Sequence, residues 1–160
     1  MLMSVYPFFE WCHNSPLGTY VRDSSYAVPL VEVVHLIGLA MLLGSLVVMD
    51  LGLLGVGMRR QPVAEYARSL EPWVWRGLTL MVLSGVPIFM NEATRCYDSW
   101  PFRIKMTLLA TAVIFHLTVH RRVTAPDRKK ISPWLGKVTG LVSMTLWFGV
   151  GMAGRAIGFV

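Results

Sequence analysis

Four long apolar segments set the strongest limit on what this chain of 160 residues can fold into. They cover about residues 26–49, 73–90, 102–119 and 138–158. A helix needs roughly 20 mostly apolar residues to cross the hydrocarbon core of a bilayer. Charged residues make up only 15% of the chain, whereas a soluble domain has about 25%. The sequence therefore predicts an all-α integral membrane four-helix bundle that forms a single domain over residues 1–160.

The segment before the first span, residues 4–22, mixes aromatic side chains with polar ones. The aromatic residues are Tyr6, Phe8, Phe9 and Trp11. This composition is typical of a short helix that lies at the membrane interface. We therefore expect a short N-terminal interfacial helix, with a partly ordered tail as the alternative.

Two connections between the spans carry most of the positive charge. Ten of the fifteen Lys and Arg residues lie in or beside residues 50–72 and 120–137. Because positive side chains are retained in the cytoplasm, both termini are predicted to be periplasmic, in the inner membrane of a bacterium. The net charge of +6 is then a topology signal and predicts no nucleic-acid partner. Residues 59–71 favour a short surface helix that ends before Pro72, and residues 120–134 favour a solvated loop.

The two cysteines, Cys12 and Cys96, both fall on the predicted outer side. The periplasm is oxidising, so the pair is a candidate disulfide. The alternative is two unpaired thiols, because the sequence does not show whether the two Cα atoms lie within disulfide range.

Ionisable residues inside the spans are costly in lipid and mark candidate functional positions. At 100° per residue they gather on one face of their helix. These residues are Glu32, His35 and Asp50 on the first span, and Lys105, His116 and His120 on the third. We expect both faces to point into the bundle, because lipid would penalise them.

Depth separates the three histidines. At 1.5 Å per residue, His35 lies about 14 Å and His116 about 21 Å from the outer ends of their spans, near the middle of a core of about 30 Å. Two inward imidazoles at similar depth favour axial ligation of a haem b iron between helices one and three. Alternatively, each histidine only hydrogen-bonds to a facing helix. His120, at the cytoplasmic boundary beside two arginines, is predicted to be an interfacial side chain and a weaker metal ligand.

Three further charged residues would complete this haem site. Arg155 and Lys105 lie toward the outer side, where they could hold haem propionates or a quinone. Glu32, one turn before His35, would handle a proton, or would pair with Arg155 and only hold helices together.

The stretches PLVEVVHLIGLAMLLGSLVVMDLGLLG, RIKMTLLATAVIFHLTVHRR and WFGVGMAGRAIGF resemble a bacterial family of small four-helix membrane proteins with no assigned function. The E-x-x-H-x-x-G pattern of Glu32, His35 and Gly38 is the most specific part of this resemblance. A looser likeness links His35 and Lys105 to the CopD copper-resistance proteins and the HemJ-type protoporphyrinogen oxidases. Those proteins place a histidine in the first span and a lysine at the start of a later one. That looser resemblance implies haem b in a four-helix bundle.

Three functional hypotheses follow. The first is a cytochrome b-like electron carrier that binds haem b and reacts with a quinone in a redox chain. The second is a copper-handling membrane protein, because ten methionines offer thioether ligands. Within the spans, however, no two methionines follow an M-x-x-M or M-x-x-x-M spacing. The third is a non-haem accessory subunit of a larger membrane complex, or a homo-oligomer. The sequence contains no hydrolase or nucleotide-binding motif, so we predict no catalytic residue and leave enzymatic activity open.

Overall fold

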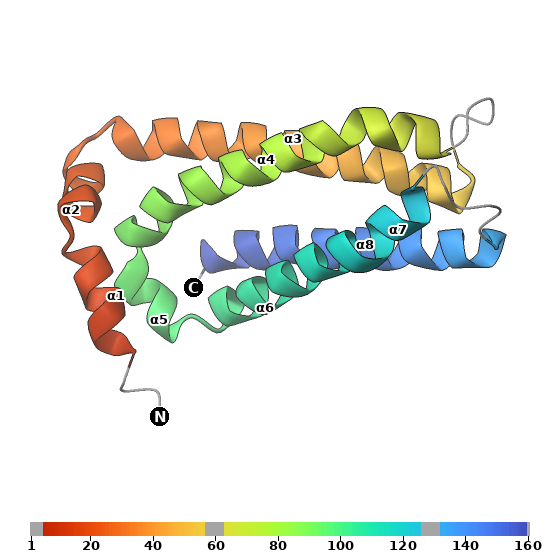
Figure 1. Ribbon diagram of the computed structural model, residues 1–160. Coiled ribbons are helices and arrows are strands. Elements are labelled where there is room, and N and C mark those ends of the chain that lie inside the picture. Colours follow the sequence, from red (N-terminus) through yellow and green to blue (C-terminus); the bar gives the residue numbers. More distant parts are fainter. Residues whose placement is uncertain (1–4, 57–62, 126–131, 160) are drawn as a thin grey trace.

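The computed structural model of the protein describes residues 5–56, 63–125 and 132–159. These residues are almost entirely helical and include no strand. Four helices are long and apolar enough to cross a membrane: α3 (Ala27–Leu54), α4 (Val63–Asn91), the continuous helix Trp100–Thr124 and α8 (Pro133–Ile157). The predicted all-α, four-helix membrane architecture is confirmed (Figure 1).

Successive long helices run in opposite directions, so both chain termini lie toward the same end of the bundle (Figure 1). α3 packs against α4 and α8, and α6 (Trp100–Phe115) packs against α8. Large apolar side chains such as Leu83 and Phe148 are exposed on the outer faces, as expected of a surface that contacts lipid. We call the end where α3 finishes and α8 begins the basic end, because most Lys and Arg residues lie in or beside the connections there.

The second span starts earlier than the sequence predicted. α4 begins at Val63 and runs without a break through Pro72, so the predicted helix end before Pro72 is wrong. Residues 59–62 of that predicted surface helix lie outside the described residues. Proline removes one N–H donor, and a membrane helix tolerates this loss because neighbouring groups satisfy the freed carbonyl. Glu71 is therefore part of a continuous helix of the bundle.

The third span consists of three consecutive helical segments: α6, the short π-helix η2 (His116–His120) and α7 (Arg121–Thr124). The hydroxyl of Thr124 donates to the carbonyl of His120 at 3.0 Å within the last turn. The predicted loop over residues 120–134 is therefore wrong at its start. Residues 126–131 of that loop lie outside the described residues.

Two glycines allow α3 and α4 to approach closely. A methyl group added at Gly77 would lie 2.6 Å from the backbone nitrogen of Leu42 and 2.8 Å from the carbonyl oxygen of Gly38. A methyl group added at Gly38 would lie 2.9 Å from Cβ of Leu80. Small residues at such crossings let membrane helices pack backbone to backbone. This contact fixes the register of α3 on α4 and places their polar residues.

The N-terminal segment forms two short helices, α1 (Tyr6–His13) and α2 (Pro16–Asp23), where the sequence predicted one. Ser15 starts the second helix, because its hydroxyl oxygen accepts the backbone N–H of Gly18 at 3.1 Å. α1 packs against the short helix α5 (Ala93–Asp98), at the end of the bundle that holds both termini (Figure 1).

Candidate functional site

Asp50 and His120 form a buried polar pair near the basic end. Nε2 of His120 donates to Oδ1 of Asp50 at 2.9 Å, and the two side chains are 0% and 1% exposed. The prediction that His120 is interfacial is therefore wrong. A rotation of about 100° per residue turns His120 inward while its neighbours Arg121 and Arg122 stay exposed.

His116 lies next to this pair inside the bundle. Its imidazole stacks on that of His120, with ring centroids 5.0 Å apart and planes inclined by 28°. Both histidines belong to η2, in which hydrogen bonds reach one residue further along the chain than in an α-helix. Single π-turns inside α-helices occur frequently at functional sites.

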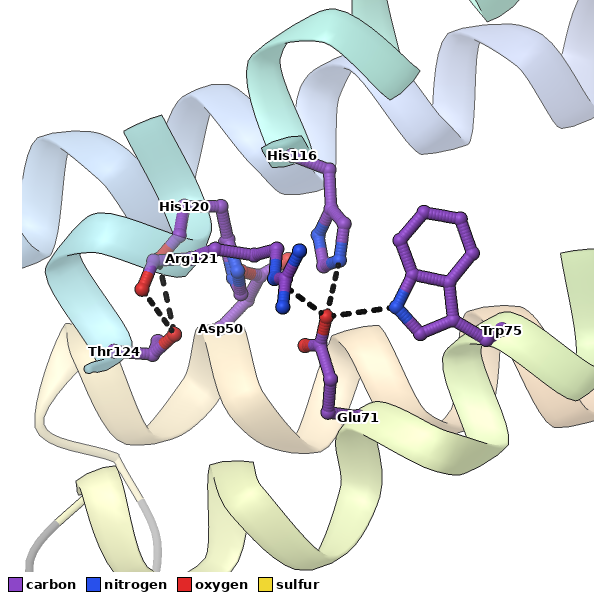
Figure 2. A network of polar contacts seen from close by, with 7 residues as sticks. All are labelled: Asp50, Glu71, Trp75, His116, His120, Arg121 and Thr124. Carbon is purple, nitrogen blue, oxygen red and sulfur yellow. Dashed lines mark hydrogen bonds and ion pairs between the residues drawn. The ribbon is translucent and has the colours of Figure 1, made fainter. Parts of the chain in front are cut away.

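Glu71 approaches His116 from α4. Its Oε1 accepts the indole N–H of Trp75 at 3.0 Å and lies 3.0 Å from Nε of Arg121. The same oxygen lies 3.5 Å from Nε2 of His116, outside good hydrogen-bond geometry. Figure 2 shows the carboxylate directed at all three partners. Glu71 is 21% exposed and Arg121 is 50% exposed, so this edge of the group reaches the surface.

These contacts define what we call the polar line: Glu71, His116, His120 and Asp50 (Figure 2). The line starts at a partly exposed carboxylate and ends at a fully buried one. It joins α4, η2 and α3, so residues from three separate parts of the sequence build it.

Several buried polar atoms of the polar line and of α8 have no hydrogen-bond partner among the described residues. They are Oδ2 of Asp50, Nδ1 of His120, both ring nitrogens of His116, Oγ of Ser143 and Nε1 of Trp147. Ser143 and Trp147 lie on the buried face of α8. Each such group costs about 1–3 kcal/mol, so proteins rarely keep them without a reason. Such buried groups are candidate partners for an ordered water or another polar group.

His35 lies far from the polar line, at the α3–α4 contact. Its Nδ1 lies 2.9 Å from the hydroxyl of Ser84, and that hydroxyl donates to the carbonyl of Leu80 at 2.6 Å. Ser84 therefore accepts the Nδ1–H of His35, which leaves Nε2 as the acceptor nitrogen. This contact matches the alternative in which His35 hydrogen-bonds to a facing helix.

The separation of His35 from His116 does not fit one haem between them. Ser84, beside His35, and Glu71, beside His116, are thirteen residues apart on α4, about 20 Å along the helix. Imidazoles that bind one metal ion must each bring a nitrogen to about 2 Å from it. Haem b held by this pair is therefore not supported, and haem b with other ligands stays a prediction.

The other predicted site residues lie in different surroundings. Lys105 reaches toward α8, where its Nζ would lie 3.6 Å from a methyl group added at Gly154. Arg155 is exposed and its guanidinium lies over the ring of Phe159, 5.6 Å from the centroid. Glu32 is also exposed. The described residues show no ion pair between Glu32 and Arg155.

Cys12 and Cys96 are both buried, and both thiols are free. They lie on α1 and α5, which pack against one another. The structure therefore shows the second of the two alternatives left by the sequence, a pair of unpaired thiols.

The sequence analysis missed one member of the polar line, Glu71, and gave another, Asp50, no specific role. Asp50 shares the predicted inward face with His35 and is a candidate functional position, but the haem hypothesis gives it no role. Glu71 carried no such signal, because Pro72 predicted that its helix ended there. In the part of the chain that the structure describes, no three His, Cys, Asp or Glu side chains converge as ligands of one metal ion.

Comparisons with known proteins place the chain in a family. A family model described as "Family of unknown function (DUF6644)" matches residues 8–160. No curated protein and no solved structure matches the chain. The match agrees with the resemblance to an uncharacterised family of membrane proteins and gives no support to the looser likeness to CopD or HemJ-type proteins. Because the match covers nearly the whole sequence, this chain belongs to the family of unknown function DUF6644.

Proposed function

We propose that this protein handles protons inside the membrane and that the polar line carries them between the basic end and Asp50. The observation that supports this most is the buried stack of His116 and His120 between two carboxylates. Imidazole exchanges protons near neutral pH more readily than other side chains. Chains of Asp, Glu and His within membrane segments commonly serve as proton relays.

Glu71 is the entry to the line. It is partly exposed, so it can take a proton from the aqueous side. Arg121 and Trp75 hold the same oxygen, Oε1, that faces His116. A small rotation of the imidazole would turn the 3.5 Å contact into a hydrogen bond and pass the proton inward.

The inner half of the line runs from His116 to Asp50. Each imidazole has at least one ring nitrogen without a partner among the described residues. Transfer between rings whose centroids are 5.0 Å apart needs a ring rotation or one bridging water. The proton that reaches His120 is then shared with Asp50 across the 2.9 Å hydrogen bond.

The line serves one side of the membrane. Toward the termini, the next buried side chains on α3 are Met49, Leu46, Ser45 and Leu42, none of which carries an ionisable group. The arrangement therefore supports proton exchange between Asp50 and the basic end, and it does not support conduction across the whole bilayer.

A pH-jump experiment tests this proposal. Purified protein in lipid nanodiscs is exposed to a rapid change of pH, and infrared bands of imidazole and carboxyl groups report protonation of the His120–Asp50 pair. We expect Glu71→Gln to slow this protonation by about tenfold, equivalent to a barrier increase of about 1.4 kcal/mol. Glu65→Gln is the matched control, because Glu65 is exposed on the same helix. Equal rates in the two variants would show that Glu71 is not the entry.

The electron-transfer hypothesis remains a second proposal, and one observation favours it. His35 donates through Nδ1 to Ser84 and keeps Nε2 as an acceptor, the arrangement typical of a metal-binding imidazole. A reduced-minus-oxidised spectrum with a b-type band, lost in His35→Ala, would support haem b. A copper-handling role is tested by metal analysis of the same preparation, and an accessory-subunit role by co-purification with a larger complex.

We also propose that the basic end faces the cytoplasm of a bacterium and that both termini are periplasmic. Single cysteines introduced in a cysteine-free background test this orientation. Ser25 precedes α3, Ser132 precedes α8, and both are exposed. A membrane-impermeant maleimide should label Ser25→Cys but not Ser132→Cys from the periplasm, and the opposite pattern would reverse the orientation.

A further inference from the structure

A small pocket lies where α1, α5 and the start of α6 meet, at the end of the bundle that holds both termini (Figure 1). It encloses about 180 Å³. Phe9 from α1 and Phe102 and Met106 from α6 line its apolar part, and Arg103 lines it as well. The pocket lies at the opposite end of the bundle from the polar line, so what it binds is independent of the proposed function.

Packed aromatic rings form one wall of this pocket. The ring of Phe9 contacts the rings of Tyr97 and Phe102 edge to face, with centroids 5.4 Å and 6.5 Å away. Phe102 in turn stacks on Phe89 of α4, with centroids 5.6 Å apart. Aromatic pairs in these geometries stabilise each other. The wall is therefore already in place before anything binds, as expected of a site for an apolar group.

Arg103 brings a positive charge to the pocket. One N–H of its guanidinium donates to the backbone carbonyl of Tyr97 at 3.1 Å. A guanidinium has five N–H donors in a planar fork that matches a carboxylate or a phosphate. No Asp or Glu among the described residues lies within ion-pair distance of Arg103. Its charge and its other donors are therefore left for an anion.

The charged and apolar parts of the pocket are ordered as in a membrane lipid. Trp100, the first residue of α6, is 68% exposed, and an exposed tryptophan at a helix end marks the membrane interface. At 1.5 Å per residue, Arg103 lies about 5 Å and Met106 about 9 Å further into the span. The cation is therefore nearer to the head groups, and the apolar part is nearer to the acyl chains.

We infer that this pocket binds an acidic phospholipid, with its phosphate on Arg103 and part of one acyl chain against Phe102 and Met106. The pocket is too small for a whole lipid, so the rest of the molecule stays in the bilayer. A zwitterionic phospholipid is attracted less, because the charge of its amine offsets that of its phosphate. A free fatty acid has a matching charge, but a bilayer contains far less of it than of phospholipid. The bound lipid contacts α1, α5 and α6 together, and so it holds the N-terminal helix on the bundle.

Native mass spectrometry tests the inference. The full-length protein is placed in nanodiscs with equal amounts of phosphatidylglycerol and phosphatidylethanolamine that carry identical acyl chains, and the lipids that stay bound after release are counted. We expect one phosphatidylglycerol to be retained in preference to phosphatidylethanolamine. Arg103→Gln should lower this retention by about fivefold, the effect of roughly one interfacial charge. Arg95→Gln is the matched control, because it removes the same charge from an exposed position on α5 that does not line the pocket.

A photoreactive lipid locates the site. Phosphatidylglycerol with a diazirine on one acyl chain should label residues 5–9 or 102–106, and an excess of unlabelled phosphatidylglycerol should prevent the labelling. Circular dichroism of both variants checks that they fold. Equal retention of the two phospholipids, equal losses in Arg103→Gln and Arg95→Gln, or labelling confined to other segments would overturn the inference. Displacement of the lipid by an equimolar fatty acid would also overturn it, because the pocket would then select a free carboxylate.

Discussion

Nε2 of His120 lies 2.9 Å from Oδ1 of Asp50, and neither side chain reaches the surface. The two residues are seventy positions apart in the sequence, on the first and third membrane helices. Their contact ties these helices together at the basic end and provides the innermost step of the polar line.

Removing one partner of the pair should cost more stability than removing both. His120→Phe leaves Asp50 buried without its partner, and we expect a loss of about 3–5 kcal/mol in the free energy of unfolding. The double variant Asp50→Leu/His120→Phe should recover most of that loss, because apolar groups replace the pair. Denaturant titration followed by circular dichroism measures both. A double variant as unstable as the single one would show that the pair's charge is not the cause.

An exposed ion pair provides the control for this prediction. Arg95 and Glu92 lie 3.6 Å apart with about half of each side chain exposed. Glu92→Gln should change stability by less than about 1 kcal/mol, because water screens such pairs.

Glu71 should matter more than an exposed glutamate on the same helix. Glu71→Ala removes the acceptor of Trp75 and the partner of Arg121, so we expect a loss of about 1–2 kcal/mol. Glu65→Ala should change stability by less than about 0.5 kcal/mol, because Glu65 is exposed. The same denaturant titration compares them. Equal effects would mean that the contacts of Glu71 contribute nothing to stability.

The close crossing of α3 and α4 predicts opposite effects for two glycine-to-alanine changes. Gly77→Ala would press a methyl group against the backbone of α3, and we expect destabilisation of about 1–3 kcal/mol. Gly44→Ala meets no atom within 4 Å and should be neutral or stabilising by up to about 1 kcal/mol, because alanine favours the helix. Unfolding midpoints of the two variants test this, and a stable Gly77→Ala protein would contradict the packing.

The reactivity of Cys96 should depend on pH in a predictable direction. Burial raises the pKa of the Cys96 thiol, and the nearby carboxylate of Glu92 adds to the effect. Only the thiolate reacts with iodoacetamide, so below the raised pKa the folded protein has less of the reactive form than an unfolded chain. In a Cys12→Ala variant, the alkylation rate should therefore keep rising at pH values where the rate of the unfolded chain has levelled off. A plateau at the same or a lower pH would contradict this.

Much of the architecture could be predicted from residue patterns, because lipid requires long apolar helices and charge asymmetry marks their connections. The helix ends could not be predicted so well. Pro72 predicts a helix end, whereas α4 continues through it, because a packed membrane helix tolerates a proline. A helix end at this position would exclude Glu71 from the second membrane span, so the sequence does not predict Glu71 as a site residue.

The candidate site could be predicted only in part. The prediction that one face of the third span points into the bundle is correct for His116 and His120, which are both buried. The pairing between helices was not visible, because depth along a helix does not show which facing residue lies opposite. Similar depth predicts that His116 faces His35, whereas the structure places His116 against His120 and Glu71. No pattern in the sequence predicts the π-turn that carries both histidines.

One measurement tests the central claim that the polar line connects Asp50 with the basic end. The chain has four histidines, so ¹⁵N-labelled imidazole signals can be assigned by single substitutions. In proteoliposomes with uniformly oriented protein, the pH is changed on one side at a time. We expect the signals of His116 and His120 to follow the pH on the side of the basic end and to ignore the opposite side. Signals that follow the opposite side, or neither side, would contradict the account.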